Sequence, residues 1–200
     1  MKEYFVKAVE NEPDWSAVPA LQVDVALWRP DPGIRMTGQF CYNANTLFVH
    51  LRCVETHIRA ELNDPLAPVC DDSCMEFFFS PDPNSDRYFN IEINPNGCIY
   101  LGFRKDRYLA SRLVPPQIQN LLHIQPRYTS DGWEVFYRIP LDFIQLFCPA
   151  FRLESGFAFR ANCYKCGGKT LQPHYLVWNP IDLPTPEFHC PQYFGKFILE

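Results

Sequence analysis

The chain has 200 residues, of which 47% are hydrophobic and 16% aromatic, so the composition suits a folded domain and excludes disorder. Its 18 basic and 23 acidic residues give a net charge of −5, and the sequence contains no block of basic residues. It therefore lacks the cluster of positive charge that is typical of nucleic-acid-binding proteins. No apolar run approaches the roughly 18 residues of a membrane-spanning helix.

Short alternating segments follow one another along the chain. Residues 34–42 and 47–53 alternate apolar and polar side chains on either side of a turn at 43–45, which predicts a hairpin. Residues 73–79 predict a short apolar strand. Further hairpins are predicted from residues 87–94 with 98–103 and from residues 123–128 with 133–139, and the last strands are expected at residues 157–163 and 193–199.

Helix signals are few, because 19 prolines against 9 glycines disfavour long helices. One or two helical turns are expected at residues 141–147 after Pro140, and a loop at residues 108–119. Short strands joined by turns predict an all-β fold, either a two-sheet sandwich or a barrel. No repeat or linker divides the chain, so we assign residues 1–200 to a single domain.

The cysteine content indicates the cellular compartment in which the protein is expected. The nine cysteines are an odd number, and the first residues lack the apolar segment of a secretory signal. We therefore interpret them as reduced thiols of a cytoplasmic protein, with secretion as the alternative.

Two predicted strands carry polar side chains on one face. Tyr88, Asn90 and Glu92 share a face because side chains alternate with period 2, and so do Arg160 and Asn162. Amides, carboxylates and guanidinium groups can bind the hydroxyls of a sugar. The alternative is that this is the solvated face of an antiparallel sheet.

Glu76 is unusual because it lies between Cys74 and Phe78 on an otherwise apolar strand. A carboxyl in such surroundings requires hydrogen bonds. It is either a functional acid or a structural acid paired with Arg52 or Arg160, or with Arg87.

The C-terminal part is rich in aromatic rings divided by prolines, and includes Tyr175, Trp178 and Phe188. Prolines restrict a loop and lower the entropy lost when it is held in one shape. Such a loop could present rings to a ligand, or the rings could close one end of the fold.

Three stretches together carry a family resemblance: residues 72–82 (DSCMEFFFSPD), 88–97 (YFNIEINPNG) and 188–197 (FHCPQYFGKF). With Trp15 and residues 46–49 (TLFV), the chain resembles the family-9 carbohydrate-binding modules, and especially the free-standing proteins related to the modules attached to xylanases. The resemblance spans nearly the whole chain. It implies a jelly-roll-like β-sandwich of two antiparallel sheets with at most one or two short helices, and binding of sugar chain ends between two tryptophans.

The resemblance also implies roles for single residues. The acid of the family site falls on Glu76, an arginine position on Asn90, an amide position on Glu92 and one tryptophan on Phe188. The second tryptophan falls at or beside Cys70, where this chain has no ring. Some family members hold structural calcium, for which oxygen ligands could come from the carboxylates of Asp64, Asp71 and Asp72.

Two other chemistries are open to this sequence, a metal or redox centre and glycoside hydrolysis. Cys163 and Cys166 with His174 suggest a zinc or redox centre, but a second ligand pair is missing, so buried thiols are favoured and no metal or cofactor is expected. Glu76 and Glu92 could instead form the carboxyl pair of a small glycosidase.

The sequence therefore predicts a non-catalytic carbohydrate-binding domain. The alternatives are a xylanase-like glycoside hydrolase and an interaction domain whose sugar site has decayed. The expected ligand-binding residues are Glu76, Asn90, Glu92, Arg160, Asn162, Trp178 and Phe188.

Overall fold

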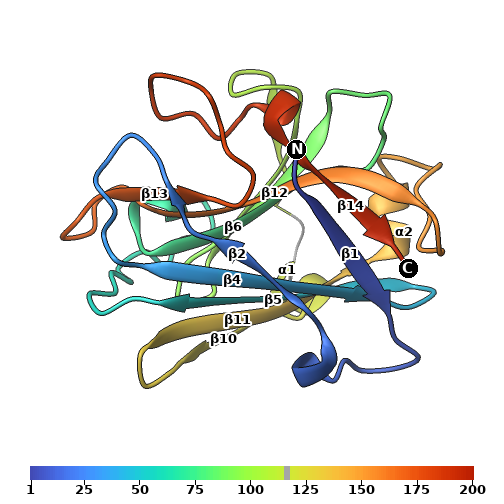
Figure 1. Ribbon diagram of the computed structural model, residues 1–200, viewed down its shortest axis with the longest axis horizontal. Coiled ribbons are helices and arrows are strands. Elements are labelled where there is room, and N and C mark those ends of the chain that lie inside the picture. Colours follow the sequence, from blue (N-terminus) through green and yellow to red (C-terminus); the bar gives the residue numbers. More distant parts are fainter. Residues whose placement is uncertain (115–117) are drawn as a thin grey trace.

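A computed structural model describes residues 1–114 and 118–200 (Figure 1). These residues form fourteen strands and two short α-helices. The strands are β1 (Glu3–Ala8), β2 (Ala20–Val23), β3 (Val25–Ala26), β4 (Arg35–Tyr42), β5 (Thr46–Val54), β6 (Cys74–Ser80), β7 (Tyr88–Ile93), β8 (Ile99–Arg104), β9 (Ala110–Arg112), β10 (Gln125–Tyr128), β11 (Gly132–Pro140), β12 (Ala158–Gly167), β13 (His174–Val177) and β14 (Gly195–Leu199). The helices are α1 (Ile118–Leu122) and α2 (Leu141–Gln145).

The three predicted hairpins are confirmed. β4 pairs antiparallel with β5, β7 with β8, and β10 with β11. The predicted helical turns after Pro140 correspond to α2. The predicted loop at residues 108–119 contains β9 and the start of α1, and its residues 115–117 lie outside the described residues.

The strands follow one hydrogen-bonded path, β10-β11-β5-β4-β1-β14-β12-β6-β7-β8-β9, which forms a single curled sheet (Figure 1). The expectation of two separate antiparallel sheets is therefore corrected. The physical reason is β1, which pairs in parallel with β14 through Glu3 and with β4 through Lys7. Because β1 forms hydrogen bonds with β14 on one side and with β4 on the other, it joins the strands before and after it in the path. The sheet is therefore mixed and open rather than divided into the two layers of a clear sandwich.

The concave side of the sheet encloses the main core. Along β11, buried side chains alternate with partly exposed ones, the pattern of a strand with one apolar face. Fully burying each large side chain of this core stabilises the fold by roughly 1.5–3 kcal/mol. The largest buried rings of the core are Trp133, Phe40, Phe77, Phe79, Phe89, Phe151 and Phe159.

The alternative interpretation of the polar face on β7 and β12, that it is simply the solvated face of the sheet, is corrected. The chain between β13 and β14 covers part of it and buries a second apolar cluster. Every residue of β6 and β7 is buried. This cluster consists of Phe78, Tyr88, Tyr164, Val177, Ile181, Cys190 and Phe194, with Phe188 packed against it.

Neither helix of the described residues has the length or the apolar character needed to cross a membrane.

Candidate functional site

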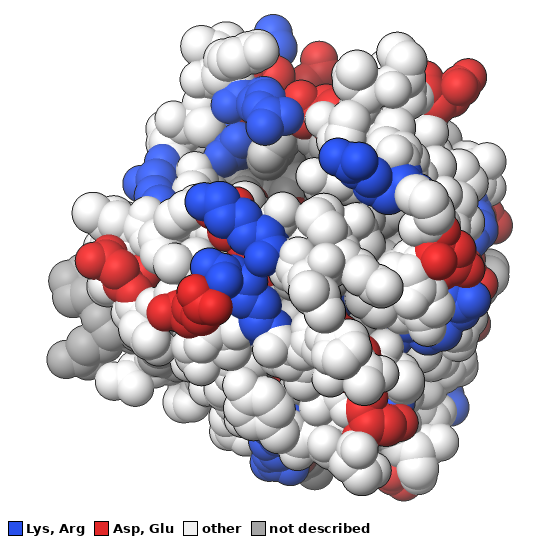
Figure 2. Space-filling model, turned by 90° about the vertical axis from the view of Figure 1, so that its left-hand side faces the viewer, with Lys and Arg blue, Asp and Glu red and all other residues white. Residues whose placement is uncertain are grey.

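A cavity of about 210 Å³ opens where the covering segment leaves the outer face of the sheet exposed. Its floor comes from β6, β7 and the end of β12, and its walls from the turn after β3, the strand β13 and the segment before β14. Figure 2 views the molecule from the side on which β13 lies in Figure 1, and basic side chains gather around a hollow on this face. The cavity is lined by Trp28, Cys70, Asp71, Glu76, Glu92, Arg107, Cys166, Gly168, Tyr175, Pro186, Glu187, Phe188 and His189.

One wall of the cavity is aromatic. Phe188 stacks on Tyr164, with ring centroids 4.3 Å apart and planes 11° from parallel. Trp28 and Tyr175 contact Phe188 at centroid distances of 5.7 and 6.0 Å. Since these rings contact one another, they form a single apolar wall rather than two plates with a gap between them.

Trp28 is held in an unusual backbone conformation. Its φ of 60° lies in the left-handed region, which is rarely adopted by bulky residues. The indole Nε1 donates a hydrogen bond to the carbonyl oxygen of Leu183 at 2.6 Å, which ties the turn after β3 to the covering segment. Such conformations persist where the surroundings fix them and are frequent at ligand sites.

Two carboxyl groups form the floor. Glu76 and Glu92 lie directly opposite each other in the antiparallel pairing of β6 and β7, and both are buried. Burial, followed by the neighbouring charge of Glu92, raises the pKa of Glu76 well above its ordinary value. Burial also raises the pKa of Glu92 to about 7, against the opposing effects of a hydrogen bond from Asn90 and the cation of Arg104.

Asn90 supports the floor from behind. Its Nδ2 donates to Glu92 Oε1 at 2.7 Å, whereas its Oδ1 is buried without a hydrogen-bond partner. Gly102 lies opposite Asn90 on β8, and a side chain at that position would collide with the Asn90 carboxamide. Asn90 therefore orients Glu92 but does not itself line the cavity.

Glu76 contacts none of the three arginines considered as structural partners. Its Oε1 accepts a hydrogen bond from the Cys166 thiol at 2.9 Å, and Arg52 instead pairs with Asp131 at 2.6 Å. The acid is thus not neutralised by a guanidinium contact.

A buried cation, Arg104, lies beside His189 of the cavity lining. Arg104 donates to the hydroxyl of Tyr100 at 2.7 Å and reaches within 3.3 Å of His189 Nε2. His189 Nδ1 lies 3.0 Å from the Tyr88 hydroxyl. Burial, with help from Arg104 and Arg107, lowers the pKa of His189 to about 3, so the ring is neutral at pH 7.

Three predicted ligand-binding residues lie elsewhere. Asn162 is buried and bonds the backbone of Asn179 through both ends of its amide. Arg160 donates to the carbonyl oxygens of Ser85 and Pro191. Trp178 is only 4% exposed and packs in the main core. The structure therefore brings Glu76, Glu92 and Phe188 together and places these three outside the cavity.

The cysteine pair of β12 does not form a shared centre with His174. Cys163 packs in the main core and Cys166 on the opposite face, because side chains three residues apart on a strand point to opposite sides. His174 Nε2 lies 2.9 Å from the buried ammonium of Lys165, which pairs with Glu55 at 3.2 Å. All nine cysteines are free, and eight are buried.

The acidic residues considered for calcium do not fit that role. Asp72 pairs with Arg59 at 3.1 Å and accepts backbone hydrogen bonds, and Asp71 pairs with Lys169 at 2.9 Å. Asp64 accepts from the backbone of Leu66. In the described part of the chain these carboxylates form no common cluster of ligand atoms.

Trp28, Arg107 and His189 line the cavity although the sequence did not predict them as ligand-binding residues. Trp28 belongs to a short irregular segment in which no periodicity marks a site. His189 follows Phe188 in the irregular segment before β14, and Arg107 lies in an exposed connection between β8 and β9. Only the convergence of distant segments assigns all three to the cavity.

Comparison with known proteins gives a consistent picture. The model of a family described as carbohydrate-binding family 9 matches residues 8–199. The structure is similar to that of a Bacteroides uniformis ATCC 8492 protein to which carbohydrate binding has been assigned, with a TM-score of 0.86 and 26% identity, covering 100% of this chain and 99% of that one. No curated protein sequence matches the chain.

Two further similar structures are those of a family-9 module from Caldicellulosiruptor kristjanssonii, one in complex with glucose and one with cellotriose. Each has a TM-score of 0.70 and 12% identity and covers 100% of this chain, with 96% and 94% of the other chain covered. At this identity the likeness establishes the fold alone.

Proposed function

The chain belongs to carbohydrate-binding family 9, and from this premise we propose that its cavity binds the terminal ring of a carbohydrate without cleaving it. One observation carries the proposal: Phe188 and Glu76 line the same cavity. A ring from the covering segment offers a flat apolar surface to the C–H face of a pyranose. At the same time, the carboxyl group of Glu76 on the floor of the cavity forms hydrogen bonds with sugar hydroxyls.

The size of the cavity favours a single sugar ring. At about 210 Å³ it is smaller than the roughly 300–1,000 Å³ of pockets that enclose drug-sized ligands. The aromatic contacts close one side, so a longer chain would extend outward toward solvent. The glucose and cellotriose complexes of the similar module support a saccharide ligand of this kind.

The raised pKa of Glu76 on the floor of the cavity also suits recognition of sugar hydroxyls. Burial raises the pKa of Glu76 well above its ordinary value and so favours the neutral acid, which offers one O–H donor and a carbonyl acceptor. Adjacent sugar hydroxyls act as both donor and acceptor, so such a group pairs with them without burying a full charge. Glu92, fixed by Asn90, provides the second contact.

Titration calorimetry with gluco-, xylo-, manno- and galacto-oligosaccharides tests this proposal. We expect heat of binding with at least one series, and a large loss of affinity in Glu76→Gln. The matched control is Glu134→Gln, which removes a carboxylate on β11 that pairs with His50 of β5, outside the cavity. The absence of heat with every series would overturn the proposal and favour an interaction domain with a decayed site.

The facing carboxyl groups support a second candidate, glycoside hydrolysis. Side chains opposite each other in an antiparallel pair have Cβ atoms about 4.5–5.5 Å apart. Retaining glycosidases hold their two carboxyl groups about 5–5.5 Å apart. Turnover of aryl glycosides that is lost in both Glu76→Gln and Glu92→Gln would establish this activity, and binding without turnover would exclude it for the sugars tested.

A further inference from the structure

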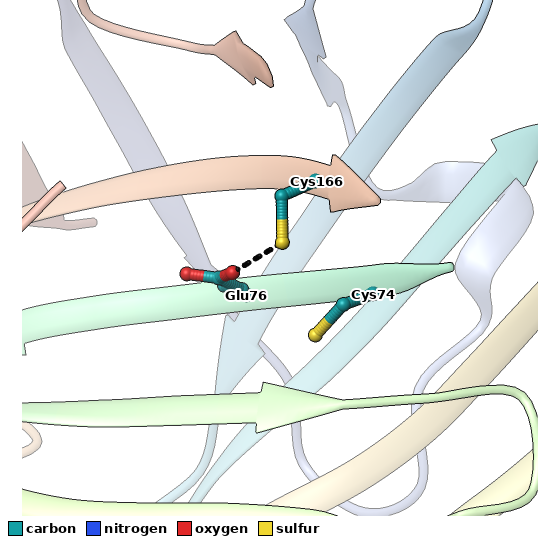
Figure 3. Close-up of side chains that lie close together, drawn as sticks. All are labelled: Cys74, Glu76 and Cys166. Carbon is teal, nitrogen blue, oxygen red and sulfur yellow. Dashed lines mark hydrogen bonds between the residues drawn. The ribbon is translucent and has the colours of Figure 1, made fainter. Parts of the chain in front are cut away.

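Two thiols and one carboxyl group converge beneath the cavity. Cys74 and Glu76 are two residues apart on β6 and therefore share a face, and Cys166 lies directly opposite Cys74 on β12. Figure 3 shows Cys166 reaching from β12 toward Glu76. One ligand atom from each residue lies within 4.8 Å of the other two.

All three side chains are withdrawn from water. Cys74, Glu76 and Cys166 are 0%, 3% and 2% exposed. Apolar neighbours, including Val69 and Cys98, surround the thiols. Potential metal ligands in one buried cluster differ from the scattered acidic groups of a protein surface, since each polar atom here must find a partner inside the protein.

We propose that Cys74, Glu76 and Cys166 bind one zinc ion. Two thiolate sulfurs select soft or borderline metals over calcium and magnesium, and the added carboxylate oxygen favours Zn²⁺ over Cu(I). With Zn–S bonds near 2.3 Å and Zn–O bonds near 2.0–2.2 Å, tetrahedral ligand atoms stand roughly 3.5–3.8 Å apart. Cys166 Sγ and Glu76 Oε1, now 2.9 Å apart, need to separate by less than about 1 Å.

Zinc binding can be written with its protons and charges balanced. Zinc replaces the two S–H protons, and the carboxyl proton as well when Glu76 is in its neutral form, and these protons leave to solvent. The three deprotonated ligands carry a charge of −3, which Zn²⁺ reduces to −1. Lys165 and Arg104 act electrostatically on Glu76 in favour of this charge, whereas Glu92 opposes it.

The cavity provides both access and the fourth coordination position. Glu76 and Cys166 line it, whereas Cys74 lies behind them. Three protein ligands with an open side are typical of zinc sites that keep a water or a ligand in the fourth position. Cys74 separates this inference from the proposed function, because it can bind metal without contacting a sugar in the cavity.

The test is titration of Zn²⁺ alone into the reduced full-length chain, with a phosphine reductant in place of a thiol. We expect one zinc per chain. Cys74→Ser and Cys166→Ser should each weaken binding by more than the roughly 10–100-fold typical of changes to residues that only support a ligand. The control is Cys148→Ser, which alters another buried cysteine, located in the main core.

Substitution with Co²⁺ gives a second readout, because thiolate-to-cobalt charge-transfer absorption reports sulfur ligation directly. We expect this absorption in the unaltered chain and in Cys148→Ser, and its loss in Cys74→Ser. Glu76→Gln, which is nearly isosteric, keeps the fold and should also weaken zinc binding. Cys74→Ser should retain sugar binding, so failure of the zinc site is distinguishable from failure of the proposed function.

Three results would overturn the zinc proposal. One is an absence of zinc binding by the folded, reduced chain. Another is equal affinity in Cys74→Ser, Cys166→Ser and Cys148→Ser. The third is cobalt absorption that lacks the thiolate band.

Discussion

Phe188 stacks face to face on Tyr164, and the Tyr164 hydroxyl donates a hydrogen bond to the Phe188 carbonyl oxygen at 3.3 Å. Tyr164 lies directly opposite Glu76 in the pairing of β12 with β6. The ring of the covering segment is thus positioned by a residue fully buried in the sheet, next to the carboxyl on the floor. This relationship makes the aromatic wall a rigid feature of the fold.

We expect Phe188→Ala to weaken oligosaccharide binding without unfolding the protein. The ring is only partly buried, so its loss removes ligand contact more than core packing. Aromatic pairs contribute about 0.5–1.5 kcal/mol beyond their area burial, so an affinity loss of roughly tenfold or more is expected. Calorimetry measures this loss, with Phe5→Ala, an exposed ring on β1, as the control. Equal affinities of the two variants would contradict the role of Phe188.

Lys165→Met should destabilise the fold strongly. Lys165 and Glu55 form an ion pair at 3.2 Å with side chains 0% and 2% exposed. Removing one partner of a buried pair leaves an uncompensated charge and costs about 3–5 kcal/mol. Urea denaturation measures the free energy of unfolding.

The matched control for Lys165 is Arg52→Ala. It breaks the Arg52–Asp131 pair, whose side chains are 35% and 45% exposed. Pairs at the surface contribute about 0–1 kcal/mol. If both variants lost the same stability, the buried pair would not be the stabilising interaction inferred here.

The sequence predicted the three hairpins, but not the short strands β2, β3, β9 and β13, the first strand β1 or the joining of the sheet. The hairpin of β4 and β5 follows from alternation around a turn, which is local information. β1 was missed because both of its partners, β14 and β4, are set by parallel pairing. The parallel contact with β14 joins residues nearly 200 positions apart, which no short-range pattern encodes.

The site shows the same division between local and tertiary information. Glu76 is the single acid of an apolar strand, and this pattern predicted that its carboxyl group is buried. The side chain is indeed 3% exposed, so removing the carboxyl group from water costs free energy. Trp178 was expected to contact ligand because it lies among the rings of the C-terminal part. Gly195 leaves the space that the Trp178 ring occupies, since a Cβ there would collide with it, so the ring packs in the core. Trp28 reaches the cavity instead, from a turn that the sequence does not mark.

Acidification should destabilise the fold in part through His189. Its folded pKa of about 3 lies below that of an unfolded histidine, near 6.5, because of burial and the cations of Arg104 and Arg107. Unfolding therefore takes up a proton below pH 6.5, and the stability present above that pH is lost as the pH falls toward 3. The loss is up to about 1.4 kcal/mol per pH unit in this window.

Urea denaturation between pH 7.5 and 4.5 tests this contribution with His189→Gln. The variant should lose less stability than the unaltered chain over the same interval. His57→Gln, which changes an exposed histidine, is the control. Parallel stability curves for His189→Gln and the unaltered chain would refute the assignment to His189.

Gly102→Ala should disturb the floor of the cavity from the far side of Asn90. The new Cβ would press against the buried Oδ1 of Asn90 and lie 3.1 Å from the ring of Tyr100. Overpacking of this kind costs about 1–3 kcal/mol. Because Asn90 Nδ2 holds Glu92 at 2.7 Å, displacing the amide should also weaken sugar binding.

A double-mutant cycle separates this collision from a general loss of packing. In Gly102→Ala with Asn90→Ala, the side chain that collides is gone, so the second substitution should recover part of the thermal stability lost in Gly102→Ala alone. Sugar affinity should stay low in the double variant, because Glu92 has lost its hydrogen-bond donor. Ser111→Ala, an exposed change on β9, controls for substitutions at this edge of the sheet. Additive losses of stability would show that Gly102 and Asn90 are not coupled, and the orientation of Glu92 would then have to depend on other contacts.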